Sequence, residues 1–96
     1  MDTKILSRVD LNLLVALQVL LEERSVTRAA ERLFITQPAM SKTLQRLRDL
    51  FDDPLFIRSG RGLIPTPRTN ELAVHLPTLL AGVSDLVASG KFDPLT

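Results

Sequence analysis

The first long apolar pattern of the chain begins after Asp10, a residue type that caps the amino ends of helices. Five leucines then recur at helical spacing as far as about Arg24: Leu13, Leu14, Leu17, Leu20 and Leu21. A second apolar stripe lies on the opposite side of the same helical wheel and consists of Leu11, Val15 and Val19. A helix that is apolar on two sides usually lies between other elements, so we expect a structural helix here. Residues 1–9, which precede it, are expected to form a loose leader.

The next segment predicts two shorter helices joined by a tight turn. The first runs from about 26 to 33, and its inward-facing residues are Val26, Ala30 and Leu33. After the interruption at Phe34 and Ile35, Thr36 can cap the second helix, and Pro38 is tolerated in a first turn, where amides need no intrahelical partner. The apolar stripe of this second helix is Met40, Leu44, Leu47 and Phe51. Its opposite face carries Pro38, Lys42, Gln45, Arg46 and Asp49, with Ser41 on the flank.

A hairpin and a long helix complete the predicted fold. Asp53 precedes Pro54, and proline disfavours helical geometry in the residue before it, so the third helix ends there. Residues 55–58 and 63–65 have the composition of two short strands, and the glycines within 59–62 suit a tight hairpin loop. Thr66 and Pro67 form a typical helix start, and the helix should continue to about Ala88. The pattern predicts a mainly α fold: a three-helix core with a β-hairpin, followed by a long helix.

The domain boundaries that we expect follow from these elements. They are a leader at 1–9, a helical domain with its hairpin at 10–66, a long helix at 67–89, and a helix stop with the start of a linker at 90–96.

The predicted long helix carries a heptad-like stripe made of Leu72, Leu76, Leu79, Val83 and Leu86. Such a stripe predicts a dimerisation seam along a helix of roughly 33 Å. The alternative is that the stripe packs onto its own domain, and one helix can serve both purposes. Pro77 removes one backbone hydrogen bond and can bend the helix.

Charge is unevenly distributed, although the net charge of the 96 residues is only +1. Nine basic and four acidic side chains lie within residues 24–68, so the two ends together are acidic. A basic centre is typical of a module that contacts a polyanion, the alternative being an ordinary solvated surface. The chain has no cysteine and one histidine, His75, which excludes disulfides and disfavours a metal site. No apolar run approaches the roughly 20 residues of a membrane span, so we expect no membrane partner and a cytoplasmic protein.

Two short helices joined by a tight turn within a basic region are typical of a helix-turn-helix. Ala30 provides a small contact where the helices cross, and the first turn of the third helix presents Gln37, Ser41 and Lys42. These side chains can hydrogen-bond to base edges or phosphates in a major groove. The adjoining hairpin, with Arg61 at its tip, favours a winged DNA-binding module over a plain helical bundle.

Three runs of residues together resemble the signature of LysR-type transcriptional regulators. They are residues 25–33, from Ser25 to Leu33; residues 36–42, from Thr36 to Lys42; and residues 54–58, from Pro54 to Arg58. Residues 10–14 and 51–56 are most similar to the NodD/NahR/LeuO-like branch, and the resemblance extends without gaps over about residues 9–88. It implies a winged helix-turn-helix domain on a linker helix that forms a homodimer, with a tetramer as an alternative for the full-length regulator. It also implies that a second, larger domain binds a small-molecule effector, and that the DNA-binding domain itself needs no cofactor.

The resemblance further implies roles for individual residues on double-stranded operator DNA, an imperfect inverted repeat. The base-reading residues would be Gln37, Pro38, Ser41, Lys42 and Arg46. The residues at phosphates would be Thr27, Arg28, Thr36 and Arg58, and Arg61 would enter a minor groove from the hairpin. Lys42 stands where arginine is more usual in the family, and Thr36 where serine is. Lysine lacks the bidentate fork of arginine, which weakens guanine recognition at position 42.

Other functions have little support in the sequence. The adjacent Asp52 and Asp53 are expected to be solvated, and His75 is expected to be a surface or interface residue. No pairing of a nucleophile with a base and no phosphate-binding loop is present, so an enzyme is not expected. The principal rival is a helical protein-interaction module with an incidental basic face.

Overall fold

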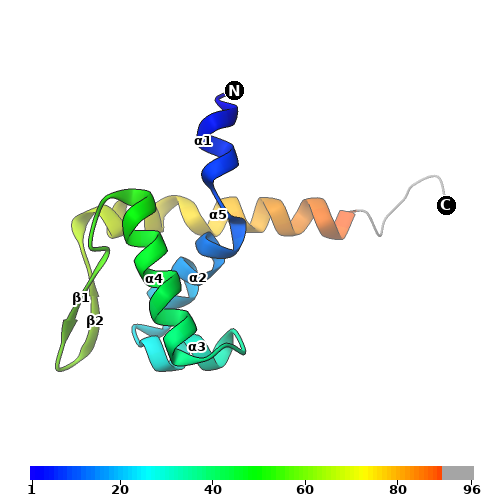
Figure 1. Ribbon diagram of the computed structural model, residues 1–96. Coiled ribbons are helices and arrows are strands. Elements are labelled where there is room, and N and C mark those ends of the chain that lie inside the picture. The colour runs from blue at the N-terminus through cyan, green and yellow to red at the C-terminus, as the bar shows by residue number, and fades with distance from the viewer. Residues whose placement is uncertain (90–96) are drawn as a thin grey trace.

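The computed structural model describes residues 1–89 and contains five helices and one hairpin in this part of the chain. The elements are α1 (Thr3–Arg8), α2 (Leu11–Glu23), α3 (Val26–Arg32), α4 (Gln37–Phe51), β1 (Phe56–Ser59), β2 (Gly62–Pro65) and α5 (Pro67–Ser89). In Figure 1, α2, α3, α4 and the hairpin form the body of the molecule, and α5 crosses this body and projects beyond it. The expected mainly α fold, with three core helices, a hairpin and a long helix, is confirmed.

The core lies among α2, α3 and α4, and α5 closes one side of it. Leu17 and Leu20 of α2 are fully buried, as are Met40 and Leu47 of α4. The sandwiched position predicted for α2 is therefore correct, although Leu11 of its second apolar stripe remains exposed. In α3, Ala29 is buried together with the predicted Val26 and Ala30. Small side chains here let α3 approach its neighbours closely.

Side-chain caps fix where the central helices begin. The Asp10 carboxylate accepts a hydrogen bond from the Asn12 amide, the Ser25 hydroxyl from the Arg28 amide, and the Thr36 hydroxyl from the Ala39 amide. Each cap satisfies an amide that has no partner within its helix. Phe34 adopts a left-handed backbone conformation (φ 57°) in the turn between α3 and α4, which redirects the chain.

The hairpin is held against the junction of α2 and α3. Its strands pair antiparallel, with Ser59 opposite Gly62, and the Leu63 amide donates to the Arg24 carbonyl at 2.9 Å. Gly62 has a φ of +104°, and a Cβ at this position would lie 2.6 Å from the Arg24 carbonyl oxygen. Glycine is therefore required at position 62 both by its backbone angle and by the close approach. This contact fixes the orientation of the hairpin relative to the helices.

A buried polar network joins the end of α4 to the start of α5. The Asp53 carboxylate accepts hydrogen bonds from the Leu55 amide at 2.8 Å and from the Thr66 hydroxyl at 2.7 Å. The Thr69 hydroxyl donates to the Leu55 carbonyl at 2.7 Å, and Thr69 is completely buried. The expectation that Asp53 is solvated is thus wrong, because its carboxylate organises the turn before the hairpin. Asp52 is exposed, as expected, and ends α4 in a left-handed conformation.

Two further expectations need correction. The supposedly loose leader contains helix α1, because the Asp2 carboxylate accepts from the Lys4 and Ile5 amides and so caps a short helix. Also, α5 has the length and composition of a membrane span over Pro67–Ala88, with a mean hydropathy of 1.3 and only 6% of the window buried. No uninterrupted apolar run in α5 reaches this length, but the average over the helix tolerates its few polar residues. The linker start expected at 90–96 lies outside the described residues.

Candidate nucleic-acid interface

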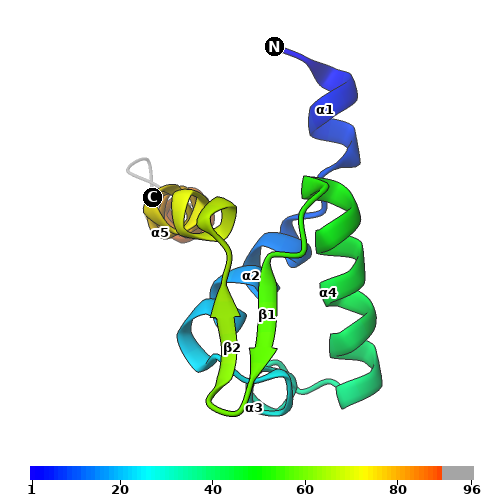
Figure 2. The same cartoon turned by 90° about the vertical axis from the view of Figure 1, so that its left-hand side faces the viewer.

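The start of α4, helix α3 and the tip of the hairpin lie at the same end of the molecule. Figures 1 and 2 show these three parts together at the bottom of both views, whereas α1 and the body of α5 lie above them. Gln37, Pro38, Ser41 and Lys42 are all exposed on the first turns of α4. Met40 and Leu44 on the other side of the helix are buried in the core and fix its rotation. The predicted base-reading side chains therefore face outward at this end.

A shallow hollow of about 200 Å³ connects the helices to the hairpin. It is lined by Thr27 at the start of α3, Gln37 at the start of α4 and Arg58 of β1, together with Ser25, Arg24 and Gly62. Three residues that the sequence analysis placed at DNA are thus brought to one concave surface. Backbone amides at helix starts and an arginine on the rim suit a phosphate group.

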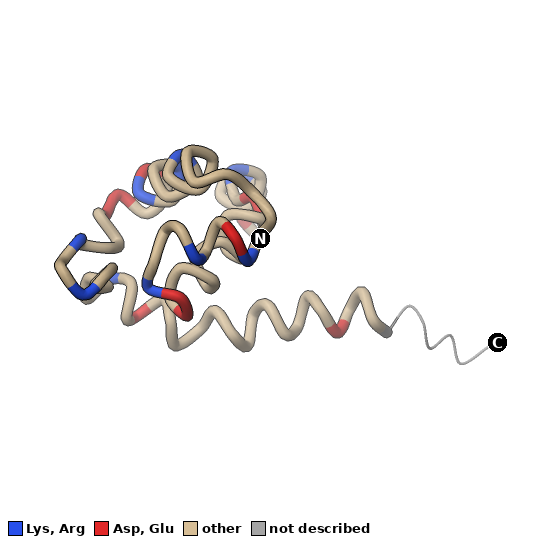
Figure 3. The backbone as a smooth tube through the Cα atoms, turned by 90° about the horizontal axis from the view of Figure 1, so that it is seen from below, with Lys and Arg blue, Asp and Glu red and all other residues tan. Residues whose placement is uncertain are grey.

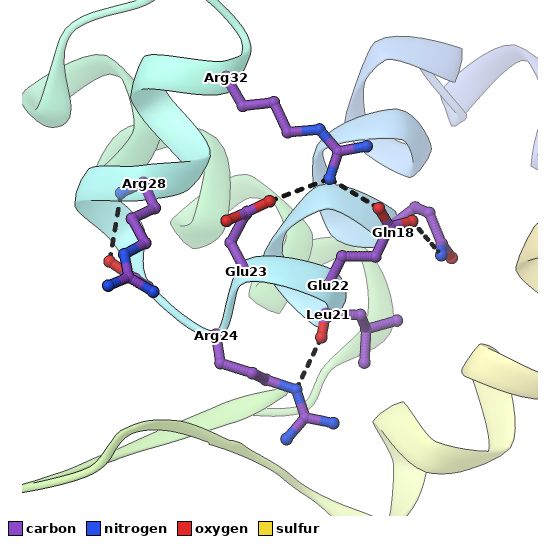
Figure 4. Close-up of polar contacts among 8 residues, drawn as sticks. Gln18, Leu21, Glu22, Glu23, Arg24, Arg28 and Arg32 are labelled. Atoms are coloured by element: carbon purple, nitrogen blue, oxygen red, sulfur yellow. Dashed lines mark hydrogen bonds and ion pairs between the residues drawn. The ribbon is translucent and has the colours of Figure 1, made fainter.

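Four of the nine basic side chains in residues 24–68 already have hydrogen bonds or ion pairs within the chain. Arg32 contacts Glu22 at 2.6 Å and Glu23 at 3.1 Å, as Figure 4 shows. The pKa of the Glu22 carboxyl lies below its ordinary value because Gln18 and Arg32 both donate hydrogen bonds to it. The other occupied side chains follow: Arg24 donates to the Leu21 carbonyl, Arg48 to the Pro54 and Phe56 carbonyls, and Arg68 pairs with Glu71.

The remaining five basic side chains are Arg28, Lys42, Arg46, Arg58 and Arg61. Within residues 1–89, none of them has a side-chain hydrogen bond or an ion pair to another residue, and all are exposed. We refer to these five residues as the cationic set. Figure 3, which views the molecule from below, shows basic positions along α4 and on the hairpin, while the projecting part of α5 is almost uncharged. All five were predicted to contact DNA, and the fold leaves their charges available for phosphates or bases.

The predicted seam of α5 divides into two parts. Leu76 is only 4% exposed and belongs to the core of its own domain, and Leu72 packs against that core. Leu79 is 48% exposed and Leu86 is 76% exposed, while Val83 is half-buried. Hence the first part of the stripe belongs to the core of its own domain, and the exposed part of the stripe is concentrated from Leu79 onward. Pro77 lies inside α5 without ending it.

Sequence analysis did not identify the residues that position the hairpin. Hydrogen bonds hold the base of the hairpin against α5, and they involve Asp53, Thr66 and Thr69. Arg48 of α4 donates a hydrogen bond to the Phe56 carbonyl of β1. The Thr66 hydroxyl bonds to the carboxylate of Asp53, 13 residues earlier, and this pairing can be recognised only in the folded chain. The one local signal was Gly62, which was interpreted as a loop residue.

Comparison with known proteins identifies the family. Residues 11–69 match the family described as bacterial regulatory helix-turn-helix protein, lysR family. The HTH-type transcriptional regulator SyrM of Rhizobium etli is 52% identical over 84 residues, which make up 88% of this chain and 25% of that protein. Nodulation protein D 1 of Bradyrhizobium sp. (strain NC92) is 45% identical over 86 residues, covering 88% of this chain and 27% of that protein. The chain therefore spans about a quarter of the length of these relatives.

Solved structures of similar proteins have the same fold. The BenM DNA-binding domain, in its complex with catB site 1 DNA, aligns with a TM-score of 0.80 at 30% identity, covering 86% of this chain and 93% of that one. The probable transcriptional regulator PA0477 of Pseudomonas aeruginosa aligns with a TM-score of 0.80 at 39% identity, covering 85% of this chain and 28% of that one. The chain belongs to the LysR family of bacterial transcriptional regulators and carries the family's winged helix-turn-helix DNA-binding domain.

Proposed function

We propose that the domain binds operator DNA with the start of α4 in the major groove and the hairpin at the adjacent minor groove. The observation that carries this proposal is the cationic set, whose five exposed side chains lie on α3, α4 and the hairpin and have no side-chain hydrogen bond or ion pair within residues 1–89. A face of this kind attracts the phosphate backbone, which supplies much of the affinity of DNA-binding proteins. The related BenM domain was crystallised in a complex with DNA, which supports DNA binding by this chain.

The roles of individual residues follow from their positions on this face. Exposed groups on the outer side of α4 would read bases, and these are Gln37, Pro38, Ser41, Lys42 and Arg46. Thr27, Thr36 and Arg58 lie at the helix starts and on β1, where they would bind phosphates together with Arg28. Arg61 at the hairpin tip would enter the minor groove, whose negative potential attracts arginine where the groove is narrow.

We further propose that α5 joins two chains into a two-fold dimer in the bacterial cytoplasm, where the chromosome lies. The exposed apolar residues of α5 from Leu79 onward support this arrangement. Two recognition helices held in a fixed relation would read an imperfect inverted repeat. The relatives are more than three times as long as this chain, and we place a small-molecule effector site in the remainder of the full-length protein.

Selection of bound sequences from random duplex DNA tests this function. The expected result is enrichment of a two-part inverted repeat, with an affinity that falls log-linearly with salt because bound phosphates release counterions. A protein-interaction module, the rival function, would enrich no sequence and would show no such salt dependence. That outcome would overturn the proposal.

A further inference from the structure

An apolar groove of about 320 Å³ lies on the side of the molecule away from the cationic set, between α1 and α5. Ile5 and Val9 form one wall, and Leu72, His75 and Leu79 form the other. Leu14, Leu50, Phe51 and Leu76 complete the lining, so no carboxylate, lysine or arginine lines the groove in the described part of the chain. An uncharged groove with apolar walls suits an apolar helix.

Helix α1 is too short to be stable by itself. It has six residues, none of them buried, and Ile5 is 60% exposed. Isolated helices of fewer than about 12 residues are marginal in water, and most helices depend on packing of an apolar face. A partner that covers Ile5 and Val9 would supply the packing that α1 lacks within this chain.

The projecting half of α5 has the chemistry to fill this groove. Between Leu72 and Ser89, Asp85 is the one charged residue of the helix. The stripe on α5 is also nearly symmetric about Leu79, because Leu72 and Leu86 lie seven residues to either side of it. If two α5 helices pair antiparallel across a two-fold axis at Leu79, each projecting half covers the other chain's groove. Seven residues of helix span roughly 10 Å in both directions, so the two surfaces match in length.

We propose that α1 is part of the dimer interface: Ile5 and Val9 form the wall of a groove that receives α5 of a second copy of this chain. The inference rests on the dimer proposed above and adds to it a surface that the heptad stripe does not contain. The interface is isologous, since each chain contributes one groove and one projecting helix. Association thereby covers the exposed apolar side of α1 and couples the amino end of the chain to dimerisation.

Three charge substitutions, measured by sedimentation equilibrium, test the proposal. Ile5→Asp should raise the dimer dissociation constant by about 10- to 100-fold, because an apolar side chain is lost from each of two grooves. Leu6→Asp is the matched control: Leu6 is 54% exposed on the same helix but does not line the groove, so its dissociation constant should stay near that of the parent. Val83→Asp tests the proposed dimer itself. At a protein concentration where the parent is monomeric, thermal melts of both α1 variants should match the parent, since α1 contributes no buried residue and association no longer adds stability. Ile5→Leu should retain the parent's dimer affinity.

The outcomes separate the two proposals. If Val83→Asp abolishes the dimer and Ile5→Asp leaves it unchanged, the α1 interface is wrong while the α5 dimer stands. If Val83→Asp leaves the dimer intact, the α5 dimer fails and the α1 interface fails with it. Equal weakening by Ile5→Asp and Leu6→Asp would show a general charge effect and overturn the groove assignment. Flotation of a monomeric parent chain with phosphatidylcholine vesicles would show that lipid, not a second copy, covers the groove.

Discussion

Arg32 and Arg58 carry the same guanidinium group but have different surroundings. Two carboxylates hold Arg32 against α2, whereas Arg58 stands on β1 with no ion pair in the described part of the chain. Both count equally in a charge profile along the sequence, which is why that profile indicated a polyanion partner without identifying the contact residues. The fold separates the structural cations from those available to DNA.

At the hairpin tip, we predict that Arg61→Ala weakens binding to sites with A·T-rich flanks more than to sites with G·C-rich flanks. Narrow A·T-rich minor grooves concentrate the negative potential that an inserted arginine senses. Titrations of matched duplexes at fixed salt would measure the difference. Arg68→Ala is the control, because Arg68 pairs with Glu71 on α5. An equal loss of affinity for both kinds of site would show that Arg61 makes an ordinary phosphate contact.

The two loop glycines should respond differently to alanine. At position 62 a Cβ would lie 2.6 Å from the Arg24 carbonyl and the φ is +104°, whereas at position 60 nothing lies within 4 Å. Gly62→Ala should therefore lower the free energy of unfolding by about 1–3 kcal/mol and weaken DNA binding by displacing the hairpin. Gly60→Ala should change both quantities little. Urea unfolding would measure the free energy of unfolding of both variants, and DNA titration would measure their affinity. Similar losses for Gly62→Ala and Gly60→Ala would contradict the close contact at position 62.

At the scale of elements, sequence patterns predicted the central helices and the hairpin to within a residue or two. Caps at Asp10 and Thr36 and stripes such as Met40–Leu44–Leu47 are local, so they can be recognised without tertiary information. The network around Asp53 could not be predicted, because Thr66 reaches Asp53 and Thr69 reaches the Leu55 carbonyl only once the hairpin has formed. For the same reason the sequence allows α5 both to pack on its own domain and to present an exposed surface, but it does not predict that the exposed part begins near Leu79.

Substitutions of Thr69 test how strongly this network holds α5 against the hairpin. Thr69→Val keeps the shape of the side chain but removes the hydroxyl that donates to the Leu55 carbonyl. We expect a loss of about 1–3 kcal/mol in the free energy of unfolding, as for other hydrogen bonds removed from buried sites. Thr69→Ser keeps the hydroxyl and should lose less. Chemical denaturation would measure the free energy of unfolding of the two variants. The prediction fails if Thr69→Ser lowers this free energy as much as Thr69→Val does.

At the scale of the whole molecule, the charged and the apolar surfaces lie apart. The cationic set lies on α3, α4 and the hairpin, whereas α1 and α5 line the apolar groove. Figures 1 and 2 show α1 and α5 above the end that holds α3, the start of α4 and the hairpin tip. A dimer formed through that apolar side would leave both cationic sets exposed to one DNA duplex. Association and DNA binding should then be coupled through effective concentration, with no direct contact between the two surfaces.

Val83→Asp should therefore weaken binding to a full operator far more than binding to an isolated half-site. The substitution buries a charge at the proposed interface and opposes association. The helix-turn-helix should keep its fold, because its core is centred on Met40, Leu44 and Leu47. Sedimentation together with titration of both duplexes provides the test. A variant that remains dimeric with unchanged operator affinity would contradict the α5 interface.

The central claim is that the first turns of α4 read the DNA sequence, and the ratio of operator to random-duplex affinity at one salt concentration tests it most directly. Gln37→Ala and Ser41→Ala should each lower this ratio by roughly 5- to 100-fold, since a good base contact contributes about 1–3 kcal/mol of discrimination. Affinity for random duplex should change little, because the cationic set is intact. Asn70→Ala, an exposed amide on α5, should leave the ratio unchanged. If both α4 variants keep the parent's ratio, sequence is read elsewhere on the molecule and the account is wrong.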